Sequence, residues 1–182
     1  MTILNGIKLK GNEINSDTIN SKEWLPAQLP NTVMAILVNN GIYKSPYFKN
    51  NMAKIPMDSI LQAWWFTKEF ELPVGSLNYN YQLHLDGINY KAEIYLNNEL
   101  IADSNKIKGA FNTFTLEAKP YLKEGKNHIT IKLIPPSTGA YTIGFVDWAP
   151  TPPDKNMGIW RAVYLKTSKT IELSESFVYS NL

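Results

Sequence analysis

The 182-residue sequence predicts an all-β fold organised as a β-sandwich. Three observations support this fold class: apolar and polar residues alternate in several segments after residue 60, the segments are short, and turn-forming residues separate them. Alternation with a period of two is typical of a strand that buries one face. About seven such segments in a chain of this length are typical of two sheets packed face to face.

The clearest candidate strands lie between residues 81 and 133, where apolar side chains occupy every second position. These side chains are Tyr81, Leu83 and Leu85, then Ala92, Ile94 and Leu96, and finally Ile129, Ile131 and Leu133. Further candidate strands are residues 64–72, 110–116, 161–167 and 171–180. The turns between strands are marked by pairs such as Asp86-Gly87, Asn97-Asn98 and Glu124-Gly125.

One short helix is expected, near residues 32–41. The apolar residues of this segment follow helical spacing: Val33, Ile36 and Leu37. Asn31 or Thr32 is suited to cap its N-terminus, and Gly41 is suited to end it. We find no internal repeat, low-complexity segment or long linker, so residues 1–182 are expected to form a single domain.

Composition and charge exclude several classes of protein. The net charge is +2 without a clustered Lys/Arg run, which argues against nucleic acid or an anionic membrane as the main partner. No apolar stretch approaches the ~18 residues of a membrane-spanning helix. There are no cysteines, so disulfides and thiolate sites are excluded, and only His84 and His128 could supply imidazole. We therefore predict no metal and no cofactor.

No pair of carboxylates stands out as an acid/base pair. Glu69 and Glu71 share one face of a predicted strand at a spacing of ~7 Å, which is typical of a solvated polar face. Asp86 precedes a turn glycine, and its role there is that of a turn residue. Two carboxyl groups that act as nucleophile and acid/base at one bond lie ~5–5.5 Å apart, and one of them has a raised pKa. The Gly-x-Ser-x-Gly motif of serine hydrolases is also missing, so we expect no catalytic residues in this chain.

The segment DWAPTPPDKNMGIWR, which begins at residue 147, is the strongest candidate for ligand binding. Sugar sites combine flat aromatic rings with Asp, Asn or Arg side chains that bond to hydroxyl groups. The residues with this chemistry are Asp147, Trp148, Asp154, Asn156 and Arg161. Under the alternative, structural interpretation, Ile159 and Trp160 enter the core and Arg161 pairs with a carboxylate or caps backbone carbonyls. We favour that interpretation for Trp160 and Arg161.

Adjacent Trp64 and Trp65 must point to opposite faces of their strand. Trp64 shares the parity of Phe66 on the apolar face, so Trp64 is expected in the core and Trp65 on the outer side. Packing in the core or against a neighbouring domain is the expected role of both. An exposed aromatic patch is expected around the loops at residues 43–48 and 147–156.

Five stretches follow one another along the chain: WLPAQLPNTVMAILVNNGIYKSPYFKNN, AWWFTKEFELP, DGINYKAEIYLNNELIA, GKNHITIKLIPP and PPDKNMGIWRAVYL. In this order they resemble the N-terminal domain of glycoside hydrolase family 2 enzymes. The resemblance covers nearly the whole chain from Trp24 onward. The form PPDKNMGIWR is most similar to exo-β-glucosaminidases and β-mannosidase-like members.

The resemblance implies a jelly-roll sandwich of the galactose-binding type. In this family the catalytic glutamates belong to a later (β/α)8 barrel, which follows an immunoglobulin-like domain, and neither domain is found in this chain. In several family members, an aspartate in the loop before a Gly-Ile-x-Arg motif reaches the active site of the barrel and bonds to the terminal sugar. Asp147 and Asp154 are both candidates here, and neither falls at the spacing of β-galactosidases. Trp148 and Asn156 complete the predicted sugar-binding set.

The resemblance thus implies a non-catalytic domain that braces the barrel and lends one wall to a pocket for a terminal β-linked sugar. Its expected partners are that carbohydrate and the other domains of the parent polypeptide. By family analogy the location is periplasmic or extracellular. A freestanding carbohydrate-binding module or adhesin is the main alternative, and a purely structural domain is a third.

Overall fold

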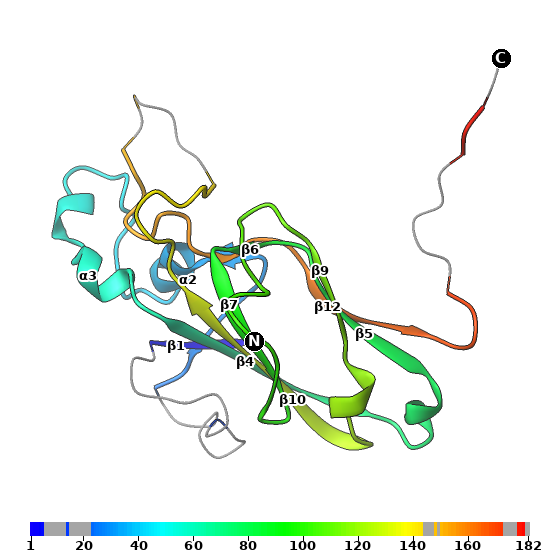
Figure 1. Cartoon of the computed structure of the whole chain (residues 1–182). Helices are drawn as coiled ribbons and strands as arrows, with labels where there is room; N and C mark the ends of the chain where they lie inside the picture. Colours follow the sequence, from blue (N-terminus) through cyan, green and yellow to red (C-terminus); the bar gives the residue numbers. More distant parts are fainter. Residues whose placement is uncertain (6–13, 15–22, 144–147, 149, 173–177, 181–182) are drawn as a thin grey trace.

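The computed structural model describes residues 1–5, 14, 23–143, 148, 150–172 and 178–180 (Figure 1). Three antiparallel sheets make up the fold. Two of them, one of six strands and one of three, enclose the core, and a second three-stranded sheet of very short strands joins loops at one end. The chain is therefore an all-β sandwich with few helices, as the alternation pattern predicts.

The six-stranded sheet has the order β2-β1-β4-β10-β7-β8. Its strands are β1 (Thr2–Asn5), β2 (Leu25–Pro26), β4 (Trp64–Leu72), β7 (Lys91–Leu96), β8 (Glu99–Ala102) and β10 (Gly125–Ile134). The facing sheet has the order β12-β5-β9. Its strands are β5 (Asn80–Leu85), β9 (Phe114–Glu117) and β12 (Val163–Ser168). Strand neighbours far apart in sequence, such as β4 and β10, show that most of the pairing is long-range.

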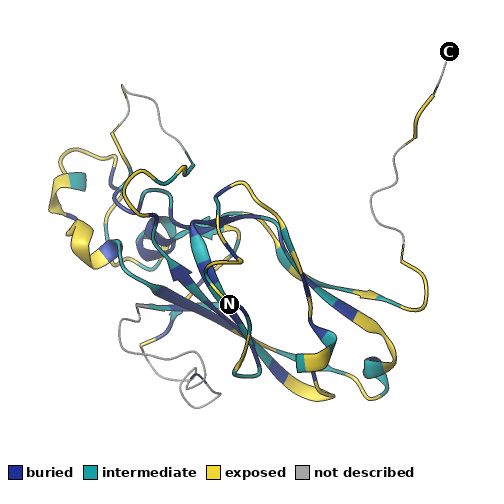
Figure 2. Cartoon of the chain, viewed as in Figure 1, coloured by how far each residue is buried: buried dark blue, intermediate teal, exposed yellow. Residues whose placement is uncertain are grey.

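The core lies between these two sheets (Figure 2). The nine alternating residues of β5, β7 and β10 predicted to face inward are all buried. Strand register explains why they form a continuous layer: Ile131 of β10 lies opposite Phe66 of β4 on one side and Ile94 of β7 on the other. All three side chains are fully buried, so one row crosses the sheet without a gap.

Trp64 and Trp65 occupy opposite faces of β4, as predicted from strand geometry. Trp64 belongs to the main core, and its Nε1 donates to the carbonyl of Ile60 at 2.9 Å. Trp65 is equally inaccessible although it faces away from the main core. Ile14 and Trp24 cover it and form a separate cluster on the outer face of the six-stranded sheet.

The predicted helix near residues 32–41 is α2 (Val33–Asn39). Thr32 is its N-cap, with Oγ1 accepting the N–H of Ala35 at 3.2 Å, and Gly41 follows its end at φ 74°. Thr32 is one of the two N-caps, Asn31 or Thr32, that the sequence left open, and Gly41 is the predicted stop residue. The other helical elements within the described residues are short turns that the sequence did not predict. They are η2 (Met52–Lys54), α3 (Met57–Ile60), η3 (Ser76–Asn78) and η4 (Lys119–Tyr121).

The small sheet joins loops beside α2. Its strands, in the order β3-β11-β6, are β3 (Asn31–Thr32), β11 (Gly158–Ile159) and β6 (Ile88–Asn89). Gly158 is required here because a Cβ would lie 2.6 Å from the Cα of Thr32 and would also collide with the carbonyl oxygen of Asn31. Close approach of two backbones is a common reason for glycine in a strand.

Two predicted strands differ from the structure. The candidate at residues 110–116 forms β9 only from Phe114 onward, because Ala110 and Phe111 lie in a turn. The predicted closing strand at residues 171–180 is wrong for its described part, since residues 171–172 and 178–180 are not in a strand and residues 173–177 lie outside the described residues. Figure 1 shows the chain leaving the sandwich after β12.

Membrane-spanning helices and metal-binding clusters are both missing from the described part of the chain. None of the helices there has the length and apolarity that crossing a membrane would require. His, Asp and Glu side chains also do not gather into groups of three or more that could hold a metal ion, as far as the described residues extend.

Candidate functional site

The predicted ligand-binding segment contains a tight turn at residues 152–157, which leads directly into β11. The N–H of Lys155 donates to the carbonyl of Pro152 at 2.9 Å, and the N–H of Met157 donates to the carbonyl of Asp154 at 2.8 Å. Lys155 and Asn156 both adopt the left-handed conformation, with φ of 50° and 55°. Two consecutive non-glycine residues in this conformation cost free energy, so the surrounding contacts must hold the turn in place.

Asp154 lies at the centre of these contacts and is only 1% exposed. Its Oδ2 accepts the backbone N–H of Met34 in α2 at 2.8 Å, and its Oδ1 accepts the N–H of Asn156 at 3.0 Å. Burial raises the pKa of the Asp154 carboxyl, while the hydrogen bonds from Met34 and Asn156 act in the opposite direction. Asp154, which the sequence predicted to bind sugar, is therefore buried inside the domain, and its carboxylate accepts hydrogen bonds from the backbone.

Asn89 of β6 holds the same turn from the other side. Its Nδ2 donates to the carbonyls of Lys155 at 3.0 Å and Asn156 at 2.8 Å, and the residue is fully buried. Its Oδ1 is buried and has no hydrogen-bond partner among the described residues. Asn89 could not be predicted from the sequence, because an asparagine after a predicted turn gives no signal of a contact more than sixty residues away.

The other predicted sugar-binding residues lie at the surface or outside the described residues. Trp148 is 86% exposed. Asn156 is half-buried, and its Nδ2 is 3.4 Å from the carbonyl oxygen of Ile143. Asp147 lies outside the described residues. The structure thus brings Asp154 and Asn156 together in one turn and leaves the Trp148 ring available at the surface.

A row of aromatic side chains crosses the neighbouring loops, which the sequence analysis did not predict. Phe111 lies 5.9 Å from Tyr141 and 6.1 Å from Trp160, measured between ring centroids. Phe111 and Tyr141 are exposed. Gly109 preceding Ala110 and Phe111 is a turn signal that could have excluded Phe111 from a strand.

Trp160 is half-buried at the end of this row, whereas Ile159 enters the core as expected. The Nε1 of Trp160 donates to the carbonyl of Ala110 at 2.9 Å. The guanidinium of Arg161 lies 5.1 Å from the centroid of the Trp160 ring, a cation–π arrangement. Of the two structural roles expected for Arg161, an ion pair or the capping of backbone carbonyls, the ion pair is not formed within the described residues, none of whose carboxylates lies within 4.0 Å of this guanidinium.

A second exposed apolar surface lies on the segment between α2 and α3. Tyr47 and Phe48 are exposed, as predicted for the patch at residues 43–48, and Ile42 and Met57 are exposed beside them in sequence. Tyr43 is half-buried instead. We call residues 42–57 the α2–α3 lobe, which is largely yellow in Figure 2.

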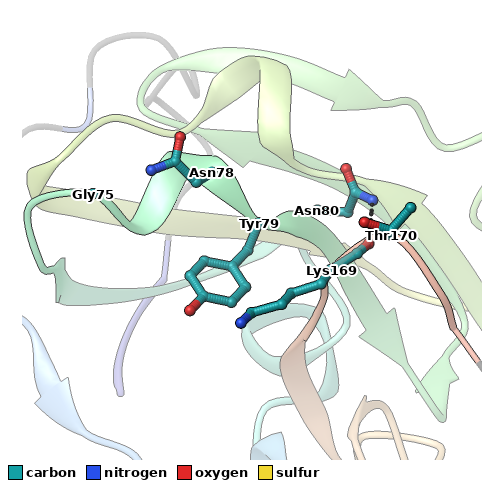
Figure 3. Close-up of a pocket in the computed structure, with 6 residues that line it drawn as sticks. All are labelled: Gly75, Asn78, Tyr79, Asn80, Lys169 and Thr170. Atoms are coloured by element: carbon teal, nitrogen blue, oxygen red, sulfur yellow. Dashed lines mark hydrogen bonds between the residues drawn. The ribbon is translucent and has the colours of Figure 1, made fainter.

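A polar cavity of about 530 Å³ lies at the other end of the sandwich (Figure 3). It is lined by Gly75, Asn78, Tyr79, Asn80, Lys169 and Thr170. Asn80 opens β5, whereas the small sheet follows the far end of that strand, so roughly 20 Å of strand separates the cavity from the turn at residues 152–157. Lys169 Nζ lies 5.6 Å from the Tyr79 ring centroid, and Asn80 Nδ2 donates to the Lys169 carbonyl at 3.0 Å. This cavity is separate from the predicted site.

Comparison with known proteins identifies the family. A family described as "Glycosyl hydrolase 2 galactose-binding domain-like" matches residues 13–141. The chain is 30% identical over 160 residues to an exo-β-D-glucosaminidase of Amycolatopsis orientalis and 35% identical over 147 residues to one of Arthroderma benhamiae. The chain therefore belongs to glycoside hydrolase family 2, as its N-terminal galactose-binding-like domain.

The solved structures agree with this assignment. The exo-chitosanase CsxA of Amycolatopsis orientalis superposes with a TM-score of 0.85 at 26% identity, over 92% of this chain and 20% of that one. A β-D-mannosidase from Dictyoglomus thermophilum shares the fold, with a TM-score of 0.67 over 83% of this chain and 21% of that one, at 24% identity. The alignment with the Amycolatopsis glucosaminidase includes 87% of this chain but only 15% of that enzyme. The alignment with the Arthroderma enzyme includes 79% of this chain and 17% of that enzyme.

Proposed function

We propose that this chain is the non-catalytic N-terminal domain of an enzyme that removes terminal β-linked sugars, and that it forms one wall of the sugar pocket. The observation that carries the proposal is the turn at residues 152–157. Two buried side chains hold this turn in an unfavourable backbone conformation, and Trp148, four residues before the turn in the sequence, is exposed. Strained turns held by the surrounding fold concentrate at functional sites.

The chemistry at the surface of this turn suits a sugar. Trp148 offers a flat apolar ring, and Asn156, eight residues later in the sequence, offers a half-buried amide. Sugar rings present apolar C–H faces as well as hydroxyl groups, so such a pair can supply stacking and hydrogen bonding together. Asp147 precedes Trp148 and adds a carboxylate that is suited to a sugar hydroxyl.

Catalysis is assigned to other domains of the same enzyme. Retention of configuration requires a nucleophile and an acid/base, both carboxyl groups, flanking the scissile bond. Burial raises the pKa of the Asp154 carboxyl, but both of its oxygens are bonded to backbone N–H groups. Glu69 and Glu71 lie exposed on β4, within the six-stranded sheet. This supports a retaining mechanism whose two carboxyl groups lie outside this chain.

The sugar proposed first is a terminal β-linked glucosamine. The two relatives described above are named exo-β-D-glucosaminidases, and a solved complex of the Amycolatopsis enzyme contains PNP-β-D-glucosamine. A pocket that binds the protonated amine of glucosamine benefits from carboxylates, and Asp147 is the candidate in this chain.

The α2–α3 lobe is proposed to brace the catalytic domain. Large apolar side chains that stay exposed in one segment mark a surface that another domain covers. The lobe contains Lys44, Lys49 and Lys54. Its sequence has no acidic residue, and Asp58 comes directly after it. The surface that packs against the lobe should therefore be apolar at its centre and acidic at its rim.

Titration of the isolated 182-residue chain with glucosamine tests the proposal against a freestanding module. A pocket wall separated from the rest of its pocket should bind with a Kd above about 1 mM, since most of the contacts are missing. Binding at micromolar Kd would favour the freestanding carbohydrate-binding module, with the exposed Tyr141 and Phe111 as its platform. The complementary measurement is hydrolysis of PNP-β-D-glucosamine by the longer polypeptide, and its absence would contradict the proposed enzyme.

A further inference from the structure

We propose that Asp154 and Asn89 are positioning residues: together they clamp the sugar-facing turn at residues 152–157 to helix α2 and strand β6, without touching the sugar. This inference rests on the proposed function for its link to catalysis. It assigns to Asp154 a role different from the direct sugar contact that the sequence suggested. It also adds Asn89, which has no other assigned role.

The carboxylate of Asp154 is fully engaged by the protein. One oxygen accepts the N–H of Met34 at 2.8 Å and the other accepts the N–H of Asn156 at 3.0 Å. With 1% of the residue exposed, the carboxylate has no access to a ligand at the surface. A direct contact with the sugar would require the turn to open and both backbone donors to lose their acceptor.

The turn also completes the start of α2. The first N–H groups of a helix have no partner within the helix and need acceptors from elsewhere. The N–H of Val33 donates to the carbonyl of Met157 at 2.8 Å, and the N–H of Met34 donates to Asp154. The third group, the N–H of Ala35, donates to the Thr32 side chain. Two of these three donors are thus satisfied by the turn, so the helix and the turn stabilise each other.

Asn89 fixes the opposite side of the turn. Its Nδ2 donates one hydrogen bond to the carbonyl of Lys155 and one to that of Asn156, the two residues with positive φ. The side chain of Asp154 accepts from the N–H of Asn156, while the side chain of Asn89 donates to its carbonyl. Both polar groups of the Asn156 backbone are therefore held by buried side chains, which determines where the Asn156 side chain points.

The direct test is amide hydrogen exchange of the 182-residue chain, measured by NMR, for the wild type and Asp154→Asn. An asparagine can accept one of the two hydrogen bonds but presents an NH2 group to the other donor. At least one of the two amides, that of Met34 or that of Asn156, should exchange about tenfold faster, as expected for the loss of a charge-assisted hydrogen bond. Unchanged protection of both amides would overturn the inference.

Asp103→Asn is the matched control. Asp103 also accepts two backbone N–H groups, those of Asn105 and Lys106, each at 3.0 Å, but it lies exposed in the turn after β8. The same substitution there should leave the exchange of the Met34 and Asn156 amides unchanged. An equal acceleration in both variants would mean that the effect is not specific to the clamp, and would contradict the inference.

Asn89→Ala is the second variant, and it decides the matter if Asp154→Asn does not fold. It removes both donors to the turn without placing a charge or an extra polar group in the interior. The amides of Asn156 and Met157 should exchange faster, while those of the main core, such as Ile131, should not. Full protection of the turn in this variant would overturn the clamp.

The link to the sugar is tested in the longer enzyme. A displaced pocket wall weakens binding of the ground state and the transition state alike, so Asp154→Asn should raise KM several-fold at nearly constant kcat. A merely structural role would instead reduce the amount of folded enzyme, which lowers apparent kcat at constant KM. If amide exchange changes while neither Asp154→Asn nor Trp148→Ala affects KM, the clamp stands and the proposed pocket wall is wrong.

Discussion

The carboxylate of Asp154 accepts the backbone N–H of Met34 at 2.8 Å, although 120 residues separate them in the sequence. This hydrogen bond joins the loop before β11 to the first turn of α2. Neither element is long enough to be stable alone, since α2 has seven residues and β11 has two. The end of the sandwich that carries the candidate site therefore depends on side chains that bridge its loops.

The stability that Asp154 contributes should depend on pH. Burial is the main cause of its raised pKa, so the folded state holds the proton more tightly than the unfolded state. The contribution of Asp154 to folding is then greatest below the ordinary carboxyl pKa and is lost as the pH rises through the raised value. In urea denaturation at stepped pH, the stability of the wild type relative to Asp154→Asn should fall across this window. A difference that rises or stays constant would contradict this prediction.

Replacing Trp65 should destabilise the domain far more than replacing Trp148. Trp65 is fully buried under Ile14 and Trp24, so Trp65→Ala removes the centre of the outer cluster and should cost about 3–5 kcal/mol. The same substitution at the exposed Trp148 should change the free energy of unfolding by less than about 0.5 kcal/mol. Urea denaturation of both variants measures the difference. Similar costs at the two positions would disprove the assignment of Trp65 to a buried cluster.

Gly158→Ala should weaken the small sheet beside the candidate site. The new methyl group would lie 2.6 Å from the Cα of Thr32, and backbone atoms cannot move aside cheaply. We expect the free energy of unfolding to fall by about 1–3 kcal/mol, the typical cost of overpacking. Gly139→Ala is the control, because its methyl group meets nothing within 4 Å and only its φ of 77° causes strain. Faster exchange of the Val33 amide should appear in Gly158→Ala alone.

Glu93 should control the ionisation of Tyr95. Burial, the hydrogen bond from the Tyr95 hydroxyl to Glu93 at 2.8 Å and the charge of Glu93 together raise the pKa of Tyr95 to about 12. Glu93→Gln removes the charge and should lower this pKa, while leaving the contribution of burial. The pKa of Tyr95 can be measured by ultraviolet absorbance titration, after the titration curve of Tyr95→Phe is subtracted from that of the wild type. An unchanged pKa would show that burial alone accounts for the shift.

The sequence pattern was sufficient where a single strand or helix determines the outcome. Alternation in β5, β7 and β10 predicted which side chains are buried, because the two faces of a strand differ by one residue in register. Asn31 or Thr32 as N-cap and Gly41 as stop residue predicted the limits of α2 to within one residue, because capping is local. The opposite orientation of Trp64 and Trp65 also follows from strand geometry alone. What covers Trp65 did not follow, since Ile14 and Trp24 come from another part of the chain.

The candidate site could be predicted only in part, because its contacts are long-range. The residue types in the 147–156 loop indicated sugar chemistry, but nothing in that segment shows that Asp154 is buried against α2. A carboxylate is normally exposed, and the capping of a helix by a side chain 120 residues away has no local signature. Asn89 and the row of Phe111, Tyr141 and Trp160 were missed for the same reason.

The central claim is tested most directly by the kinetics of the longer enzyme on PNP-β-D-glucosamine, comparing the wild type with a Trp148→Ala, Asn156→Ala double variant. A pocket wall formed by this domain predicts a KM raised several-fold or more, because contacts to the bound sugar are lost. Val74→Ala, at an exposed position near the other end of the sandwich, should leave KM unchanged. A double variant with the wild-type KM and kcat would show that the 147–156 loop does not contact the sugar, and would contradict the account.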